Sequence, residues 1–78
     1  MNNIQQTESP ELKAWRDKVI VQILYIRDEG LTNMFDTRNV SELAALYDFC
    51  ELAGFISKNK VSYSAFILSG NREKITRP

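Results

Sequence analysis

Carboxylates are the residues of this sequence whose chemistry could support acid–base catalysis. The candidates are Asp28, Glu29, Asp36, Asp48 and Glu51. A general acid or base must reach the proton that it transfers, and none of the five has a recognisable partner residue at a catalytic spacing. The sequence also lacks a glycine-rich phosphate loop, a Gly-x-Ser-x-Gly elbow and a cluster of metal ligands. We therefore expect no catalytic residue, no metal site and no cofactor, and we predict that the protein is not an enzyme.

Cys50 is the only cysteine, and the sequence contains no histidine. These counts exclude a Cys–His nucleophile, a Cys–His metal site and an internal disulfide, and they favour a cytoplasmic protein. Because Cys50 follows Phe49 and lies near Leu52, we expect it to be a small buried hydrophobic side chain.

The sequence shows no feature of export or membrane insertion. Residues 1–9 are polar, so we expect no signal peptide. The longest apolar run, residues 19–26, is interrupted by Gln22 and is too short to span a bilayer. We therefore predict a soluble protein with no membrane partner.

The segment Thr32–Asp36 places two large apolar side chains, Met34 and Phe35, in a connection between two predicted helices. Such side chains either pack back onto the domain or form an exposed recognition patch, and both interpretations stay open. We expect Asn33 and Asp36 to accept hydrogen bonds from backbone N–H groups around the start of the following helix, as short polar side chains do in turns and caps.

The clearest helix signals bracket residues 10–29. Ser9 suits the N-cap, Pro10 suits the first helical position, and Gly30 can adopt the left-handed conformation that ends a helix. The apolar side chains on one face recur every three or four residues, at Leu12, Trp15, Val19, Ile23 and Ile26. A strand is the competing interpretation because many of these residues are β-branched. We favour the helix, because nothing between the start and stop signals breaks it.

This helix has more apolar side chains than one face can hold. Ile20, Val21, Leu24 and Tyr25 lie off the main stripe, and a helix that is apolar on nearly all sides is either central in the core or shared with another subunit. A chain of 78 residues forms one domain, whose core supplies about 3 to 5 kcal/mol of net stability. We expect a dimer formed through Trp15, Ile20 and Leu24, although Trp15 could lie at the core edge instead.

Three shorter helices are predicted after the turn. The first covers residues 37–47 behind a cap at Asp36 or Thr37, and the second covers residues 49–58. Their inward side chains are predicted to be Val40, Leu43, Ala44, Tyr47, Phe49, Leu52, Ala53 and Ile56. Gly54 lies inside the second of these helices, where glycine costs about 1 kcal/mol relative to alanine, so we expect another group to approach its backbone closely.

The last helix is predicted to follow a turn at Asn59 and Lys60, to open at Val61 or Ser62, and to stop at Gly70. Its inward side chains are predicted to be Tyr63, Phe66 and Ile67. The prediction is an all-α bundle of one long and three short helices with helix-turn-helix-like packing. Its parts are a disordered segment at 1–8, a helical domain at 9–70 and a basic tail at 71–78.

Charge is balanced overall but uneven along the chain. The formal net charge is zero, whereas residues 1–57 carry five basic and nine acidic residues and residues 58–78 carry five basic and one acidic residue. A neutral chain lacks the general attraction to phosphate that dominates nucleic-acid affinity, so nucleic acid is not the expected partner. The unevenness favours contact between different parts of two copies, or with a charged partner.

Two functional hypotheses follow. The first is a non-catalytic protein that binds a protein partner through Met34, Phe35, Arg72, Lys74 and Arg77. The second is a small DNA-associated regulator that uses the helix pair at 37–58 and the basic tail. The second helix of that pair starts Cys50-Glu51-Leu52 and offers few of the side chains that read base edges, which disfavours the second hypothesis.

A family resemblance rests on a set of residues between Ile26 and Gly70. They are Ile26-Arg27-Asp28, Gly30, Thr32-Asn33-Met34-Phe35-Asp36, Val40, Ala44, Phe49, Glu51-Leu52, Phe55-Ile56, Tyr63 and Phe66-Ile67-Leu68-x-Gly70. Here the chain resembles the domain-of-unknown-function family 5049, short proteins of bacteriophages and Gram-positive prophages. It departs at Asp48 and Gly54. The resemblance implies a phage or prophage origin, a small helical fold and a bacterial host cell, but no activity. The first hypothesis then becomes a protein that binds, and could inhibit, a host or phage protein.

Overall fold

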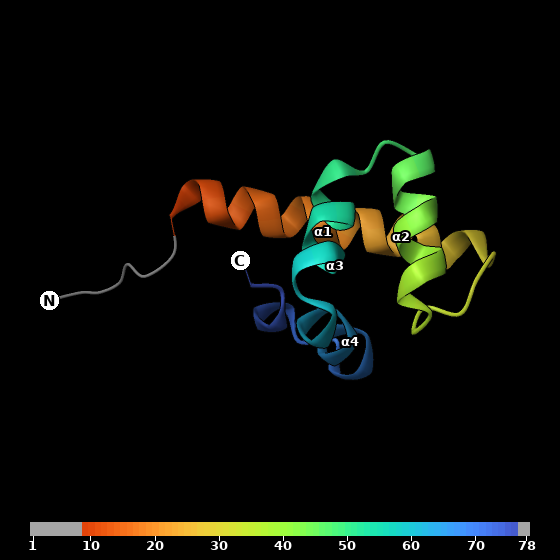
Figure 1. Cartoon of the computed structure of the whole chain (residues 1–78). Helices are drawn as coiled ribbons and strands as arrows, with labels where there is room; N and C mark the ends of the chain where they lie inside the picture. The colour runs from red at the N-terminus through yellow and green to blue at the C-terminus, as the bar shows by residue number, and fades with distance from the viewer. Residues whose placement is uncertain (1–8, 77–78) are drawn as a thin grey trace, which may run out of the picture.

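The computed structural model describes residues 9–76 and shows four helices in that part of the chain. They are α1 (Pro10–Glu29), α2 (Thr37–Leu46), α3 (Cys50–Lys58) and α4 (Lys60–Ser69), followed by a short 3-10 helix, η2 (Arg72–Lys74). In Figure 1, α1 is a long rod that α2 and α3 cross, and its first turns project beyond the other helices. The predicted small all-α bundle is confirmed. Among the described residues, no helix has the length and apolar character needed to cross a membrane.

Side-chain caps and left-handed glycines together set most of the helix ends. The Ser9 hydroxyl accepts the Leu12 N–H at 3.1 Å, and the Asp36 carboxylate accepts the Asn39 N–H at 3.1 Å. Gly30 and Gly70 are both left-handed, with φ of 67° and 71°, and end α1 and α4. The predicted bounds of α1 are confirmed, while α2 ends one residue before the predicted end and α3 starts one residue after the predicted start.

The start of α4 differs from the prediction. Asn59 does not form a separate turn with Lys60, because its side chain accepts the Ser62 N–H at 3.3 Å and so caps α4. Its own N–H donates to the Phe55 carbonyl at 2.9 Å and closes α3. A single residue therefore ends one helix and begins the next, and Lys60 is already helical.

The core lies where α1 meets the three shorter helices. Its buried apolar side chains are Val19, Ile23, Ile26, Val40, Ala44, Leu52, Phe55, Ile56, Tyr63, Phe66 and Ile75. Ile75 is fully buried, and its carbonyl accepts from the Arg16 side chain at 3.0 Å. The packed chain therefore extends to at least Ile75, beyond the boundary at residue 70 that the sequence predicts. The expected disordered segment at 1–8 and the cation Arg77 lie outside the described residues.

Gln22 is the buried polar residue of this core, at 7% exposure. Its side-chain oxygen accepts the Leu52 N–H at 3.0 Å, and its side-chain nitrogen donates to the Glu51 carboxylate at 3.0 Å. The residue before α3, Phe49, has no side chain that can cap that helix. The cap of α3 therefore comes from α1, which the sequence did not reveal because Gln22 is distant along the chain.

Cys50 and Gly54 correct two expectations about α3. The helix buries Leu52, Phe55 and Ile56, so residues 50 and 54, one turn apart on the opposite face, point outward. Cys50 is exposed rather than buried. Gly54 is exposed too, and a Cβ atom built there meets no atom within 4 Å. No close approach compensates for this glycine.

We predict that Gly54→Ala stabilises the protein by about 1 kcal/mol, because alanine has the higher helix propensity and the added methyl group enters open space. Urea denaturation monitored by circular dichroism measures the change. A loss of stability would show that a group does pack against this position in solution.

We predict that Gln22→Met lowers the free energy of unfolding by about 1 to 3 kcal/mol. Methionine keeps much of the buried volume but accepts hydrogen bonds poorly, so the Leu52 N–H loses its partner. The same denaturation experiment tests this, with the exposed α2 residue Asn39 changed to Met as the control for polar-to-methionine replacement. Unchanged stability of Gln22→Met would show that the cap is dispensable.

Candidate interaction surfaces

The turn between α1 and α2 is held rigidly by its polar groups. Asn33 accepts the Phe35 N–H on its side chain and the Asp36 N–H on its carbonyl, both at 2.9 Å. The Tyr63 hydroxyl donates to the Met34 carbonyl at 2.6 Å. Burial raises the pKa of Tyr63, so this hydroxyl stays a donor. The expected roles of Asn33 and Asp36 as acceptors of backbone N–H groups are confirmed.

The two large side chains of this turn have different environments. Met34 is half-buried against the core, as the packing interpretation proposed. Phe35, the next residue, keeps 52% of its surface exposed. The prediction from sequence gave both residues the same interpretation, but only Met34 packs onto the core.

Phe35 lies in the same connection as Leu31, and Leu46 of α2 lines the same hollow as Leu31; we call these three residues the loop surface. Leu31 and Leu46 are 61% and 75% exposed. They border a shallow hollow of about 450 Å³ whose lining is Leu31, Thr32, Asn39, Glu42, Leu43 and Leu46. The α1–α2 connection and α2 thus combine exposed apolar side chains with a turn of defined geometry.

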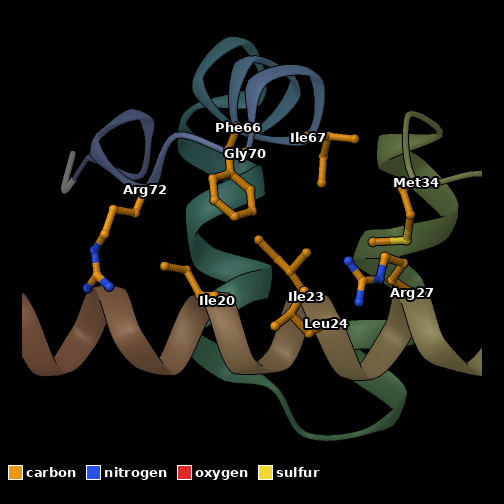
Figure 2. Close-up of a pocket in the computed structure, with 9 residues that line it drawn as sticks. All are labelled: Ile20, Ile23, Leu24, Arg27, Met34, Phe66, Ile67, Gly70 and Arg72. Atoms are coloured by element: carbon orange, nitrogen blue, oxygen red, sulfur yellow. The ribbon is translucent and has the colours of Figure 1, made fainter.

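A second hollow, which we call the α1 groove, has a volume of about 460 Å³ and lies between α1 and the C-terminal half of α4 (Figure 2). Its lining is Ile20, Ile23, Leu24, Arg27, Met34, Phe66, Ile67, Gly70 and Arg72. The structure therefore brings together two residues predicted for self-association, Ile20 and Leu24, with two predicted for partner binding, Met34 and Arg72.

The remaining predicted residues lie outside the α1 groove lining. Trp15 is half-buried at the core edge, where its ring meets Phe55 edge-on with centroids 5.8 Å apart. Lys74 is exposed on η2. Neither residue lines the groove.

Each end of the α1 groove carries an arginine that pairs with an aspartate of α1. Arg27 contacts Asp28 at 3.2 Å, and Arg72 of the C-terminal segment reaches Asp17. Figure 2 shows the two arginines at opposite ends of the groove. Asp17 also pairs with Lys13 at 3.0 Å. Hydrogen bonds from Lys13 and then Arg72 lower the pKa of Asp17.

The acidic side chain at the start of α3 is held in a similar way. Glu51 accepts from Gln22 and lies 3.6 Å from the Lys18 ammonium group. The pKa of Glu51 is lowered first by the hydrogen bond from Gln22 and then by the backbone N–H of Glu51 itself, with a smaller contribution from Lys18. These contacts stabilise the ionised carboxylate.

In the described residues, no cluster of three His, Cys, Asp or Glu side chains is arranged to hold a metal ion.

Comparison with known proteins gives one finding on family. A family model described as a domain of unknown function, DUF5049, matches residues 15–71. No curated protein and no solved structure matches the chain.

The lowered pKa values of Glu51 and Asp17 predict a loss of stability in acid. A carboxyl group whose pKa is lower in the folded state contributes stability above its usual pKa, and this contribution disappears as the pH falls through the folded-state value. We expect the urea midpoint to decrease on acidification below the usual carboxyl range. In Glu51→Gln, which cannot titrate at this position, the decrease should be smaller. An identical decrease in the variant would contradict the assignment to Glu51.

Proposed function

Because the chain belongs to the DUF5049 family, whose description assigns no activity, we propose a function from its surfaces: a non-catalytic protein that binds a protein partner through the loop surface. The observation that carries the proposal is the exposure of Leu31 and Phe35 in the connection between α1 and α2 and of Leu46 on α2. Large apolar side chains grouped at a surface are typical of binding sites.

The rigidity of the turn supports this proposal. Asn33, Asp36 and Tyr63 hold the backbone on both sides of Phe35. An aromatic side chain held in place before binding loses little conformational entropy when a partner covers it, and such anchors dominate interface energies. Phe35 is therefore the proposed anchor.

The charge around the loop surface indicates the chemistry of the partner. Residues 27–42, which carry Leu31 and Phe35, include four acidic residues and two basic ones. On α2, Glu42 borders the hollow between Leu31 and Leu46. A partner segment that presents an apolar side chain next to Lys or Arg would fill the hollow and complement this charge.

We propose that the partner is a protein of a bacterial host or of a phage, that binding takes place in the host cytoplasm, and that one consequence of binding is inhibition of the partner. The support is the phage and prophage context that the family resemblance implies. Catalysis is not needed for this role, since occupation of a surface on the partner is enough.

The DNA-regulator hypothesis has less support. The exposed positions of α3 are Cys50, Gly54, Ser57 and Lys58. Of these only Lys58, in the last turn, has a side chain of the kind that reaches base edges, whereas a recognition helix reads bases from its N-terminal turns. The zero formal charge also disfavours nucleic-acid binding. Treatment of a captured complex with nuclease distinguishes the two hypotheses, because a protein complex survives it.

We predict that Phe35→Ala stays folded but loses its partner. More than half of the Phe35 surface is already exposed. Truncation should therefore lower the free energy of unfolding by far less than the loss of about 3 to 5 kcal/mol that is typical of a buried aromatic side chain. Affinity capture from host lysate with nuclease treatment, followed by a binding titration of the captured protein, measures the effect. We expect an affinity loss of about 30-fold or more.

Leu46→Glu should weaken binding in the same titration, because it removes an apolar contact of the loop surface and puts in its place a charged group that loses its water when the partner's apolar side chain covers it. Val61→Glu is the matched control, since Val61 is 81% exposed on α4 and outside the loop surface. If Phe35→Ala and Leu46→Glu bind as tightly as the control, the proposed surface is wrong.

A further inference from the structure

The outer side of α1 carries an acidic, apolar, apolar, acidic stripe formed by Asp17, Val21, Leu24 and Asp28. Their spacing of four, three and four residues keeps them on one side of the helix. Val21 is 64% exposed and Leu24 is 36% exposed. Leu24 also lines the α1 groove, so the stripe and the groove form one continuous surface.

The cations beside this stripe lie at its two ends. Arg72 reaches the stripe at Asp17, and Arg27 reaches it at Asp28. At 1.5 Å per residue, these two positions are about 16 Å apart along the helix. A helix that packs along this surface would therefore need acidic residues about eleven positions apart, with apolar residues between them.

α1 has this pattern itself. We propose that a second copy of the chain covers the stripe, with the two α1 helices antiparallel and related by a two-fold axis between residues 22 and 23. In this arrangement Val21 of each copy lies opposite Leu24 of the other. Asp28 of the second copy then approaches Arg72, and Asp17 of the second copy approaches Arg27.

Symmetry explains why the antiparallel arrangement fits. A two-fold interface brings the same surface of both copies together, so every contact occurs twice. In the antiparallel pair Asp17 lies opposite Asp28 of the other copy, and Arg72 of one copy and Arg27 of the other lie beside these two aspartates, so the charges at each end balance. In the antiparallel pair, residues whose numbers add to about 45 lie opposite each other. This brings Lys18 toward Glu29 of the second copy, on the side of the stripe away from Arg27.

Arg27 and Arg72 can form these contacts without losing the hydrogen bonds that they already make. A guanidinium group has five N–H donors. Arg27 uses its Nε and one terminal nitrogen on Asp28, and Arg72 uses one terminal nitrogen on Asp17. Both side chains are about half exposed or more, at 59% and 49%. Each can thus bridge an aspartate of its own chain and one of the second copy.

The proposed interface refines the sequence prediction of a dimer. Leu24 lies in the interface and Ile20 borders it, whereas Trp15 packs against Phe55 at the core edge and lies off the stripe. The loop surface is separate from the stripe, so a Phe35→Ala chain should dimerise normally. Dimerisation and partner binding therefore succeed or fail independently.

Sedimentation velocity over a range of concentrations tests the dimer. The full-length chain should dimerise, and Leu24→Glu should raise the dimer dissociation constant about 100-fold, since two apolar contacts are lost per dimer. Val61→Glu, a control at a more exposed apolar position on α4, should have no effect. Circular dichroism checks that each variant is folded. A wild-type chain that stays monomeric at high micromolar concentration overturns the proposal, as does equal weakening by Val61→Glu.

Charge reversal tests the antiparallel geometry. Asp28→Arg alone should weaken the dimer about 10-fold, because it faces Arg72 of the other copy, and Arg72→Glu alone should weaken it similarly. The double variant Asp28→Arg/Arg72→Glu should recover most of the lost affinity, because the two reversed charges attract each other across the interface. Failure of the double variant to recover, while Leu24→Glu still splits the dimer, would overturn the antiparallel arrangement.

Discussion

The side-chain amide of Gln22 is the contact on which the relative placement of α1 and α3 depends. It accepts the backbone N–H of Leu52 and donates to Glu51, so the middle of the long helix provides the missing cap of the third. A buried amide satisfies its hydrogen-bonding groups in few orientations, so this pair of bonds selects one register between the helices. Apolar packing around Val19, Ile23 and Ile26 supplies the larger share of the stability but is less specific about register.

The other elements pack on different sides of α1. α2 and α3 cover its inner side, while Ile75 and the Arg16 contact hold the C-terminal segment beside its N-terminal half. That segment delivers Arg72 to Asp17 at one end of the α1 groove. Within residues 9–76, the other elements leave the outer side of α1 partly uncovered, so that Val21 is 64% and Leu24 is 36% exposed.

The residues that carry the family resemblance are largely explained by this architecture. Gly30 and Gly70 end helices in the left-handed conformation, and Asn33 and Asp36 accept backbone N–H groups around the turn. Tyr63 joins the core to that turn through the Met34 carbonyl. Phe35 differs from these residues, because its exposed ring has no comparable structural role and so suits recognition.

The sequence alone determined the features that depend on neighbouring residues. Ser9, Gly30, Asp36 and Gly70 mark helix ends through local hydrogen bonds and backbone conformation, and the apolar spacing predicted which face of each helix is buried. Tertiary structure decided what depends on distant residues. It buried Gln22 and Ile75, exposed Cys50 and Gly54, and separated Met34 from Phe35. Periodicity gives the direction of a side chain relative to its own helix, but what that side chain meets depends on how the helices pack.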